Sequence, residues 1–474
     1  MTITMKWILS AIATLGILAP LPTVAAPLCR TELPGAITRI INRPEWERSR
    51  WGLLIQPLDD DTPLYNHQGT AYFNPASSAK LLTTAAALHH FGPDYRILTP
   101  IQITGRPPRL QTLRLIGKGD PTLTPQDLQT FAQYLGEQGV TEIDRLIVED
   151  GYLPGPATHP TWEFSDLYFY YGMVVNSLIL NENSFPLTIT PQQPGQPVAI
   201  TSEDGLALAQ WEIENQARSA PPETPYSLQM TGRVGEPVLA FRGRFPVDTA
   251  PRQWRMALRD PGAYFLAQLE QSLQAEGITV QSTQIDRTPQ RHKGKETFLL
   301  QSPPLSQLLQ DTNQPSNNLY AEVLLQTLGL GVGQESSLSA LTVILSQLGV
   351  EADTHQLRDG SGLSRHNLLS PLALVQTLQG METTPHREVF RASLPVAGVS
   401  GTLQGRFQDT PLAGVLLAKT GTMTGVSTLA GYVDQPDGST VVFSIMVNQS
   451  EQAISRQRAA IDEIVLLLWN LQDC

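Results

Sequence analysis

The sequence predicts a multidomain α/β protein in which an antiparallel sheet covered by helices is interrupted by a large inserted domain. At 474 residues the chain is longer than chains that usually fold around a single hydrophobic core, so two or three domains are expected. Two strand-like runs near its end, Leu429–Val433 and Val441–Ile445, flank Asp437-Gly438, a strong signal for an antiparallel hairpin. Lys80 and Ser316 belong to motifs that we expect to share one site, yet 236 residues separate them, which is too long for a connection inside one compact domain.

The early part of the main domain is expected to contain two strands and a helix. Gly52–Ile55 and Ala71–Phe73 are apolar runs of strand length. Asn74-Pro75-Ala76 then leads into a helix with several apolar positions, which ends near Phe91-Gly92-Pro93.

The insertion has two parts of different composition. From Ile101 to Val148 short apolar runs alternate with turns, and a helix fits Pro125–Gln138. From Pro186 to Pro246 the chain is Pro-rich with brief β-like pieces, which is typical of a small β-domain. A helix with an apolar stripe leads back, and Arg291–Lys295 is expected to be a solvated turn at the return; the stripe is Tyr264, Leu266, Leu269 and Leu273.

The last part of the chain completes the main domain. Ser316 follows Asp311–Pro315, a predicted loop that opens a second helix running through Ala321 and Leu325. The apolar run Val415–Ala418 is expected to be a strand that ends at Lys419. The final helix, expected over Ile454–Leu471, has a broad apolar face that should pack on the sheet.

Composition and charge argue against several classes of partner. With 41% hydrophobic and 16% charged residues, the chain is typical of a globular protein. A formal net charge of −12 and a pI near 5.2 argue against nucleic acid, which favours a basic footprint. No Lys/Arg-rich run suggests binding to anionic lipid. No Cys-x-x-Cys, His-Glu-x-x-His or histidine cluster occurs, so neither a metal site nor a cofactor is predicted.

Residues 1–25 are predicted to be a signal peptide. Lys6 supplies a thin positive region, Trp7–Leu18 an apolar one, and Thr23–Ala26 a small-residue cleavage site, with cleavage after Ala25. An uncleaved membrane anchor is the alternative, although the apolar stretch is short for a membrane span. We therefore expect export to the periplasm or cell envelope, with peripheral membrane association at most.

The two cysteines lie at opposite ends of the mature chain. Cys29 follows the predicted cleavage point closely, and Cys474 is the last residue. In an oxidising compartment two and only two cysteines invite a disulfide. Two free thiols remain the alternative.

Three short motifs in a fixed order indicate the chemistry: Ser77-Ser78-Ala79-Lys80, Ser316-Asn317-Asn318 and Lys419-Thr420-Gly421-Thr422. A serine is a poor nucleophile until a base takes its proton, and the lysine of the first motif lies one helical turn from its serine, on the same face. The second motif adds a hydroxyl for proton relay and an amide for holding substrate. The third offers a cation, hydroxyls and a strand edge to an anionic peptide end. Class A β-lactamases and penicillin-binding proteins share this set, which predicts a penicillin-sensitive acyl-transfer site.

With these motifs, the chain resembles the D-alanyl-D-alanine carboxypeptidase/endopeptidase family of class C low-molecular-mass penicillin-binding proteins, of the penicillin-binding protein 4 type. Further segments resemble that family over nearly the whole mature chain: Gly119–Leu123, Trp162–Gly172, Leu180–Asn183, Asp359–Asn367, Leu394–Gly398 and Gly401–Leu403. The resemblance is strongest from Ser316 onward and weakest between about Pro186 and Pro246.

The resemblance implies a β-lactamase/transpeptidase-like catalytic domain built from residues 26–97 and 296–474. A second domain, residues 98–185 and 247–295, is inserted between the first two motifs, and a nested third domain, residues 186–246, is rich in β-structure. In this fold the first and last helices pack on the same sheet, which would bring Cys29 near Cys474.

The catalytic roles follow from the chemistry of the motifs. Ser77 Oγ attacks the carbonyl between two D-alanines and forms an acyl-enzyme, while Lys80 receives its proton. Ser316 passes a proton to the departing D-alanine, and Asn318 hydrogen-bonds the substrate amide and Lys80. Lys419 lowers the pKa of Lys80 and attracts the terminal carboxylate.

Binding roles are expected for the third motif as well. The backbone N–H groups of Ser77 and Thr422 form the oxyanion hole. The hydroxyls of Thr420 and Thr422 bind the carboxylate, and Gly421 lets the ligand approach the strand closely.

The resemblance also implies a pocket for the diamino acid side chain of the stem peptide, at Asp166 and Arg365. One fixed charge of each sign suits a zwitterionic side chain, and arginine binds carboxylates as a bidentate fork. The alternative is that Asp166 caps a turn and Arg365 is a surface ion-pair partner. Thr424 stands where family members can carry Gln.

Other functions are less consistent with the sequence. A serine β-lactamase of class A would need a Glu-x-x-Leu-Asn loop, and the sequence around Asn181-Glu182-Asn183 lacks that pattern. An α/β-hydrolase would need a Gly-x-Ser-x-Gly elbow, which is absent. A non-catalytic cell-wall-binding scaffold would typically have lost a catalytic residue, and all are present. The expected partners are therefore peptidoglycan stem peptides and β-lactam antibiotics.

Overall fold

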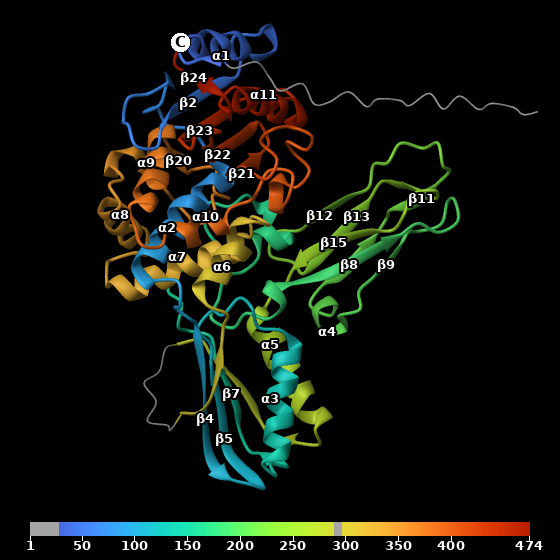
Figure 1. Cartoon of the computed structure of the whole chain (residues 1–474). Helices are drawn as coiled ribbons and strands as arrows, with labels where there is room; N and C mark the ends of the chain where they lie inside the picture. The colour runs from blue at the N-terminus through green and yellow to red at the C-terminus, as the bar shows by residue number, and fades with distance from the viewer. Residues whose placement is uncertain (1–27, 289–295) are drawn as a thin grey trace, which may run out of the picture.

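The computed structural model describes residues 28–288 and 296–474 (Figure 1). The predicted signal peptide and the predicted solvated turn at Arg291–Lys295 lie outside these residues. Among the described residues no single helix is long and apolar enough to cross a membrane. The helices α7 (Asn318–Val332) and α8 (Ser337–Gln347) meet that criterion only as a pair, which is bent by 82°.

The main sheet joins the two ends of the chain. Its five antiparallel strands lie in the order β21-β22-β23-β2-β3. Their bounds are Leu416–Met423, Val426–Asp434, Thr440–Asn448, Arg50–Pro57 and Tyr65–His67. The predicted hairpin is confirmed, because Val433 pairs with Val441 across the turn at Asp437-Gly438.

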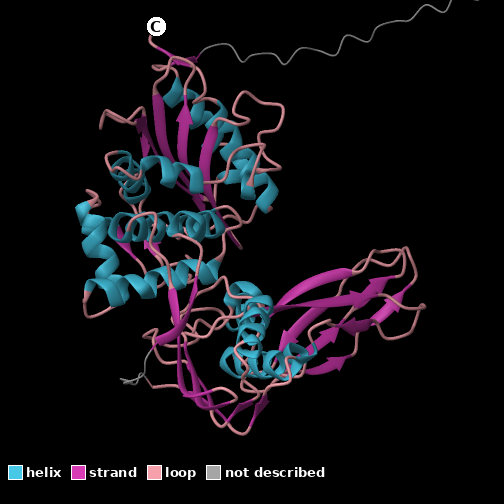
Figure 2. Ribbon diagram, turned by 60° about the horizontal axis from the view of Figure 1, so that its bottom comes forward, coloured by secondary structure: helices cyan, strands magenta, loops and turns pink. Residues whose placement is uncertain are grey.

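Helices cover both faces of this sheet (Figure 2). Alternate residues of β22 and β23 enter different cores, as the two-residue period of a strand requires: Tyr432 and Met446 face one core, and Leu429 and Phe443 the other. One core holds α2, α9 and the helices around them, and the other holds α1 and α11. The bounds are α1 Leu33–Ile41, α2 Lys80–Phe91, α6 Leu305–Asn313, α9 Pro371–Glu382, α10 Arg387–Ser393 and α11 Ile454–Leu466. The short strands β19 (His355–Gln356) and β20 (Leu368–Leu369) pair beside α9.

The final helix is shorter than predicted, since α11 ends at Leu466 rather than Leu471. The chain leaves the helix because Leu471–Gln472 forms β24, which pairs with β1 (Leu28–Cys29). A disulfide joins Cys29 to Cys474 with their Cα atoms 5.6 Å apart, so the two ends of the described chain are held together.

A second sheet of seven strands forms the lower lobe in Figure 1. It contains β4 (Leu98–Arg106), β5 (Arg109–Ile116), β6 (Glu142–Ile143), β7 (Leu146–Glu149), β16 (Thr279–Val280), β17 (Thr283–Asp286) and β18 (Glu296–Gln301). The helices α3 (Pro125–Glu137) and α5 (Pro261–Ala275) contact each other beside it. The helix α3 begins at Pro125, as predicted. Thr124 and Asp127 form a capping box that satisfies the backbone N–H groups at this helix start.

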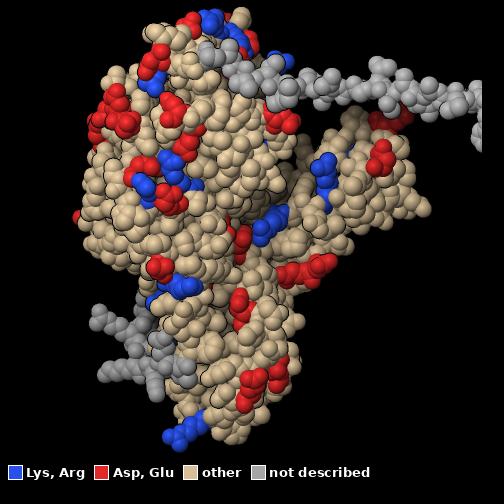
Figure 3. All heavy atoms as spheres, viewed as in Figure 1, with Lys and Arg blue, Asp and Glu red and all other residues tan. Residues whose placement is uncertain are grey.

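Short strands form the third lobe, at the right of Figure 1. Its small sheets are β15-β8-β9, β10-β13-β12 and β11-β14. The bounds are β8 Ser184–Thr190, β9 Ala199–Thr201, α4 Gly205–Leu208, β10 Glu212–Asn215, β11 Arg218–Ala220, β12 Gln229–Gly232, β13 Val238–Arg242, β14 Arg244–Pro246 and β15 Arg252–Ala257. Figure 3 shows acidic and basic side chains interspersed over the three lobes.

Candidate active site

The first motif is held against the main sheet by polar side chains of two strands. Asn448, at the end of β23, accepts from Asn74 N at 2.7 Å and donates back to Asn74 O at 3.1 Å. Thr428 of β22 donates to Pro75 O at 2.9 Å. The following 3₁₀ turn η2 (Ala76–Ala79) carries Ser77 and leads directly into α2. The nucleophile expected from the sequence is therefore fixed at the helix start.

Lys80 is fully buried below Ser77, and its ammonium has three acceptors within reach. Nζ lies 3.0 Å from Ser77 Oγ, 2.6 Å from Asn318 Oδ1 and 2.6 Å from the Ser361 carbonyl. Asn318 opens α7 and donates its own amide to Tyr171 O at 2.7 Å. The first two motifs thus meet at one amine, as the sequence predicts, although Ser361 was not expected there.

The second and third motifs meet through Ser316 and Lys419. Ser316 lies between α6 and α7 with φ of 64°, and its Oγ accepts from Lys419 Nζ at 2.9 Å. Lys419 also donates to Thr420 O at 3.0 Å and is fully buried on the edge strand β21. Each of the two serine hydroxyls therefore has a buried lysine amine within hydrogen-bond distance.

Gly421 allows β21 to lie close to the nucleophile segment. A Cβ there would approach Thr428 Oγ1 to 2.2 Å and Pro75 O to 2.6 Å. The close approach that we expected for a ligand is made here by the chain's own atoms.

The hydroxyls of the third motif have partners that the sequence did not reveal. Thr420 Oγ1 donates to Thr402 Oγ1 at 2.7 Å, and Thr422 Oγ1 accepts from Arg458, an exposed residue of α11, at 3.1 Å. Arg458 adds a positive charge to the outer end of β21.

The two lysines have depressed basicity. Burial lowers the pKa of Lys80 to about 7, while the carboxylates of Asp359 and Glu322 oppose the shift. Burial also lowers the pKa of Lys419 well below its usual value, and the charge of Lys80 adds to that effect. A neutral lysine beside Ser77 near pH 7 is what general-base catalysis needs.

A cavity of about 480 Å³ opens in front of these motifs. Ser77, Ser316, Asn318 and Thr422 line one part of it, and the other lining residues include Glu163, Asp166, Tyr171, Arg365 and Thr424. The structure therefore places Asp166 and Arg365 in the same cavity as the serines.

Arg365 is engaged within this cavity. Its Nε lies 2.6 Å from Glu163 Oε1, and its NH1 donates to Thr424 O at 3.3 Å. Burial raises the pKa of the half-buried Asp166, and the neighbouring Glu163 carboxylate raises it further, whereas Arg365 opposes both. Glu163 is one residue of this pocket that sequence reasoning missed, and Tyr170 and Met423 are others. The position of Glu163 three residues before Asp166 was the only available signal.

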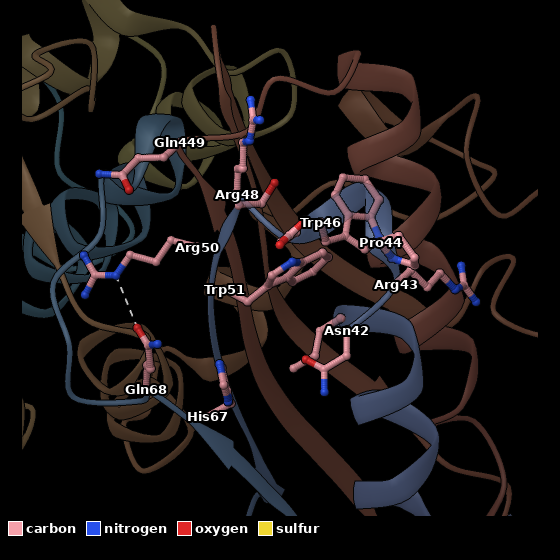
Figure 4. Close-up of a pocket in the computed structure, with 13 residues that line it drawn as sticks. Asn42, Arg43, Pro44, Trp46, Arg48, Arg50, Trp51, His67, Gln68 and Gln449 are labelled. Atoms are coloured by element: carbon pink, nitrogen blue, oxygen red, sulfur yellow. Dashed lines mark hydrogen bonds between the residues drawn. The ribbon is translucent and has the colours of Figure 1, made fainter.

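A second cavity, of about 740 Å³, lies where α1 leads into β2 (Figure 4). Its arginines are engaged: Arg43 donates twice to Glu463, and Arg50 donates to Gln68 at 3.2 Å while lying over the Phe73 ring. Its lining residues include no serine–lysine pair, so the chemistry belongs to the smaller cavity.

Comparisons with known proteins agree on one family. The model of the D-Ala-D-Ala carboxypeptidase 3 (S13) family matches residues 33–467. A D-alanyl-D-alanine carboxypeptidase of Actinomadura sp. (strain R39) is 32% identical over 439 residues, which cover 88% of this chain and 81% of that protein. The penicillin-sensitive carboxypeptidase A of Dictyostelium discoideum is 28% identical over 468 residues, covering 89% and 87%.

Solved structures agree on the fold. The crystal structure of penicillin binding protein 4 (dacB) from Haemophilus influenzae has a TM-score of 0.79 at 24% identity and covers 91% of this chain and 98% of that chain. The same protein complexed with a β-lactam has a TM-score of 0.74 at 23% identity, with the same coverage. The fold is therefore of the β-lactamase/transpeptidase-like α/β type. The chain belongs to the D-Ala-D-Ala carboxypeptidase 3 (S13) family of serine-type D-Ala-D-Ala carboxypeptidases.

Proposed function

We propose that the protein cleaves the bond between the two terminal D-alanines of peptidoglycan stem peptides through an acyl-enzyme on Ser77, and that penicillins acylate the same residue. The observation that carries this proposal is the pairing of two hydroxyls with two buried amines. Lys80 Nζ lies 3.0 Å from Ser77 Oγ, and Lys419 Nζ lies 2.9 Å from Ser316 Oγ. Each hydroxyl thus has a partner that can take or return a proton.

Acylation begins with Lys80 in its neutral form, which a pKa of about 7 makes available near neutral pH. Lys80 takes the proton as Ser77 Oγ attacks the scissile carbonyl, and the backbone N–H groups of Ser77 and Thr422 stabilise the oxyanion. The proton reaches the departing D-alanine amine through Ser316, which Lys419 holds in place. Water then hydrolyses the acyl group and regenerates the serine.

The terminal carboxylate of the substrate binds at the outer end of β21. Lys419 supplies the inner positive charge, because the bound carboxylate stabilises the ammonium form that burial disfavours in the free protein. The hydroxyls of Thr420 and Thr422 supply hydrogen bonds. Arg458, which already donates to Thr422 Oγ1 at 3.1 Å, adds an outer cation. An anion is favoured there because two cations and two hydroxyls converge on one strand edge.

The diamino acid side chain of the stem peptide binds between Asp166 and Arg365. Both residues line the cavity that contains Ser77. Asp166 accepts from the ammonium, and Arg365 binds the carboxylate as a fork. The substrate carboxylate then replaces Glu163, which occupies Arg365 at 2.6 Å in the free protein.

We further propose that the protein acts at the cell wall and that it also cleaves D,D-crosslinks. The expected cell-wall substrate and the predicted signal peptide support a location in the periplasm or cell envelope. A D,D-crosslink presents a D-alanyl bond to the same serine, so endopeptidase activity needs no further catalytic group. We also propose the predicted arrangement of three domains, at residues 26–97 with 296–474, 98–185 with 247–295, and 186–246, with two bounds moved. β18 (Glu296–Gln301) pairs with β4 and so belongs to the second domain, and β15 (Arg252–Ala257) pairs with β8 and so belongs to the third.

Labelling with a fluorescent penicillin tests the proposal. A D,D-peptidase should give a persistent label that Ser77→Ala removes without loss of fold. A transient label would favour the serine β-lactamase, and the absence of any label would favour the non-catalytic scaffold. Incubation with peptidoglycan fragments and mass analysis of the products then reports whether D-alanine or crosslinked peptides are released.

A further inference from the structure

Two buried carboxylates lie close to Lys80 and take no part in the proposed reaction. Glu322 is 4% exposed, and Asp359 is 0% exposed. Glu322 lies on α7 one turn after Asn318, which bonds Lys80, so both side chains project from the same face of the helix. The helices α2 and α7 contact each other directly (Figure 1).

Glu322 holds the loop that presents an acceptor to Lys80. Its Oε1 accepts from Gly360 N at 3.0 Å and from Ser361 N at 2.7 Å. Thr83 of α2 donates to Gly360 O at 2.7 Å, which fixes the other side of the same peptide unit. The next carbonyl along the chain, Ser361 O, accepts from Lys80 Nζ at 2.6 Å.

Asp359 holds the adjoining peptide unit. Its Oδ1 accepts from Gly362 N at 2.9 Å, and this amide belongs to the same unit as the Ser361 carbonyl. Gly362 has φ of +82°, and a Cβ there would approach Ala76 O to 1.9 Å, so the loop can pack this closely only with glycine. Each peptide unit of the loop beside Lys80 is therefore anchored by a carboxylate.

We propose that Glu322 is a positioning residue for Lys80: its carboxylate anchors the Gly360–Ser361 peptide unit, which leads into the carbonyl that Lys80 contacts, and supplies negative charge that stabilises the ammonium formed during acylation. The inference rests on the proposed function, in which Lys80 is the base. In that step the O–H bond of Ser77 breaks, its oxygen bonds the substrate carbonyl carbon, and the proton forms a third N–H bond on Lys80. The ammonium then has three acceptors for three N–H groups: Ser77 Oγ, Asn318 Oδ1 and Ser361 O.

The charges around Glu322 determine whether it raises or lowers the pKa of Lys80. Burial raises its pKa to about 7, the Asp359 carboxylate adds to this, and the backbone donors of Gly360 and Ser361 oppose it. The charge of Glu322 in turn raises the pKa of Lys80. The helix α8 has no titratable residue. Of the other elements that contact α7, α2 carries Lys80, His89 and His90, α6 carries Asp311, and η4 (Tyr170–Gly172) carries Tyr170 and Tyr171. Asp359 lies in the loop that Glu322 holds, and Lys419 contacts Ser316 just before α7. Loss of the Glu322 charge should therefore lower the pKa of Lys80.

The test is Glu322→Gln, in which the amide oxygen can still accept from both backbone N–H groups. The second-order rate constant for acylation by a chromogenic cephalosporin is measured by stopped flow from about pH 5 to about pH 10. The midpoint of the acid limb should move to lower pH by about one unit. The plateau should fall a few-fold, because a less basic amine is a weaker proton acceptor. A midpoint that coincides with that of the unmodified protein would overturn the inference.

Two matched variants separate charge from shape. Glu322→Asp keeps the charge but shortens the side chain, so the midpoint should stay while the plateau falls. If Glu322→Asp moves the midpoint as far as Glu322→Gln does, or if Glu322→Asp changes neither midpoint nor plateau, the inference is wrong. Glu335→Gln, the same change at an exposed position after α7, should leave the profile unchanged. Absence of acylation in the unmodified protein would contradict the proposed function, whereas normal acylation with an unmoved midpoint contradicts only the role of Glu322.

Discussion

Substitution of Asp166 by Asn should weaken recognition of the diamino acid side chain without harming the chemistry at Ser77. Asp166 lines the same cavity as Ser77 but does not belong to the hydrogen-bonded set of the three motifs. A hydrogen bond between charged groups contributes about 1.5–3 kcal/mol, and Asp166 is only half-buried, so the lower value applies. About 1.5 kcal/mol corresponds to roughly a tenfold loss.

The assay compares two pentapeptides that differ only in the third residue, one with diaminopimelate and one with alanine. For Asp166→Asn, kcat/KM should fall about tenfold on the first peptide, mainly through KM, and stay unchanged on the second. Glu163→Gln is the matched control, since it neutralises a neighbouring carboxylate that occupies Arg365. It should lower KM for the diaminopimelate peptide. An equal loss on both peptides with Asp166→Asn would show that Asp166 supports the fold instead.

Three other predictions concern the base, the second lysine and the termini. The acylation rate of the unmodified protein should rise with pH through about 7, because Lys80 acts in its neutral form above its pKa; a stopped-flow rate that falls over this range contradicts that role. Lys419→Ala should lower kcat/KM for acyl-D-Ala-D-Ala peptides by about 100-fold. An unchanged kcat/KM would contradict the proposed role of Lys419 in binding and catalysis. Cys474→Ser should lower the melting temperature by several degrees and leave the acylation rate unchanged, since a native disulfide contributes about 2–5 kcal/mol in small domains and the bridge lies at the chain ends. Equal melting temperatures would show that the bridge does not contribute to stability.

Local patterns in the sequence were enough to predict the hairpin between β22 and β23 and the start of α3. Both depend on neighbouring residues: a turn at Asp437-Gly438 and a proline after Thr124. The motifs at Ser77, Ser316 and Lys419 also meet as their chemistry requires, since Lys80 contacts Ser77 and Lys419 contacts Ser316.

Other features depend on contacts between distant segments. The final helix is shorter than its apolar pattern suggests because β24 pairs with β1 at the opposite end of the chain. Arg458 reaches Thr422, and Glu322 holds Gly360, across 36 and 38 residues. A single sequence offers no signal for such pairs, since neither partner belongs to a spaced motif with the other.

Peptide mapping after reaction with penicillin tests the central claim most directly. The intact protein should gain the mass of one penicillin, and fragmentation should locate it on the peptide that contains Ser77. Ser77→Ala, with an unchanged melting temperature, should gain none. An adduct on any other residue, or an adduct that persists in Ser77→Ala, would contradict the assignment of Ser77 as the nucleophile.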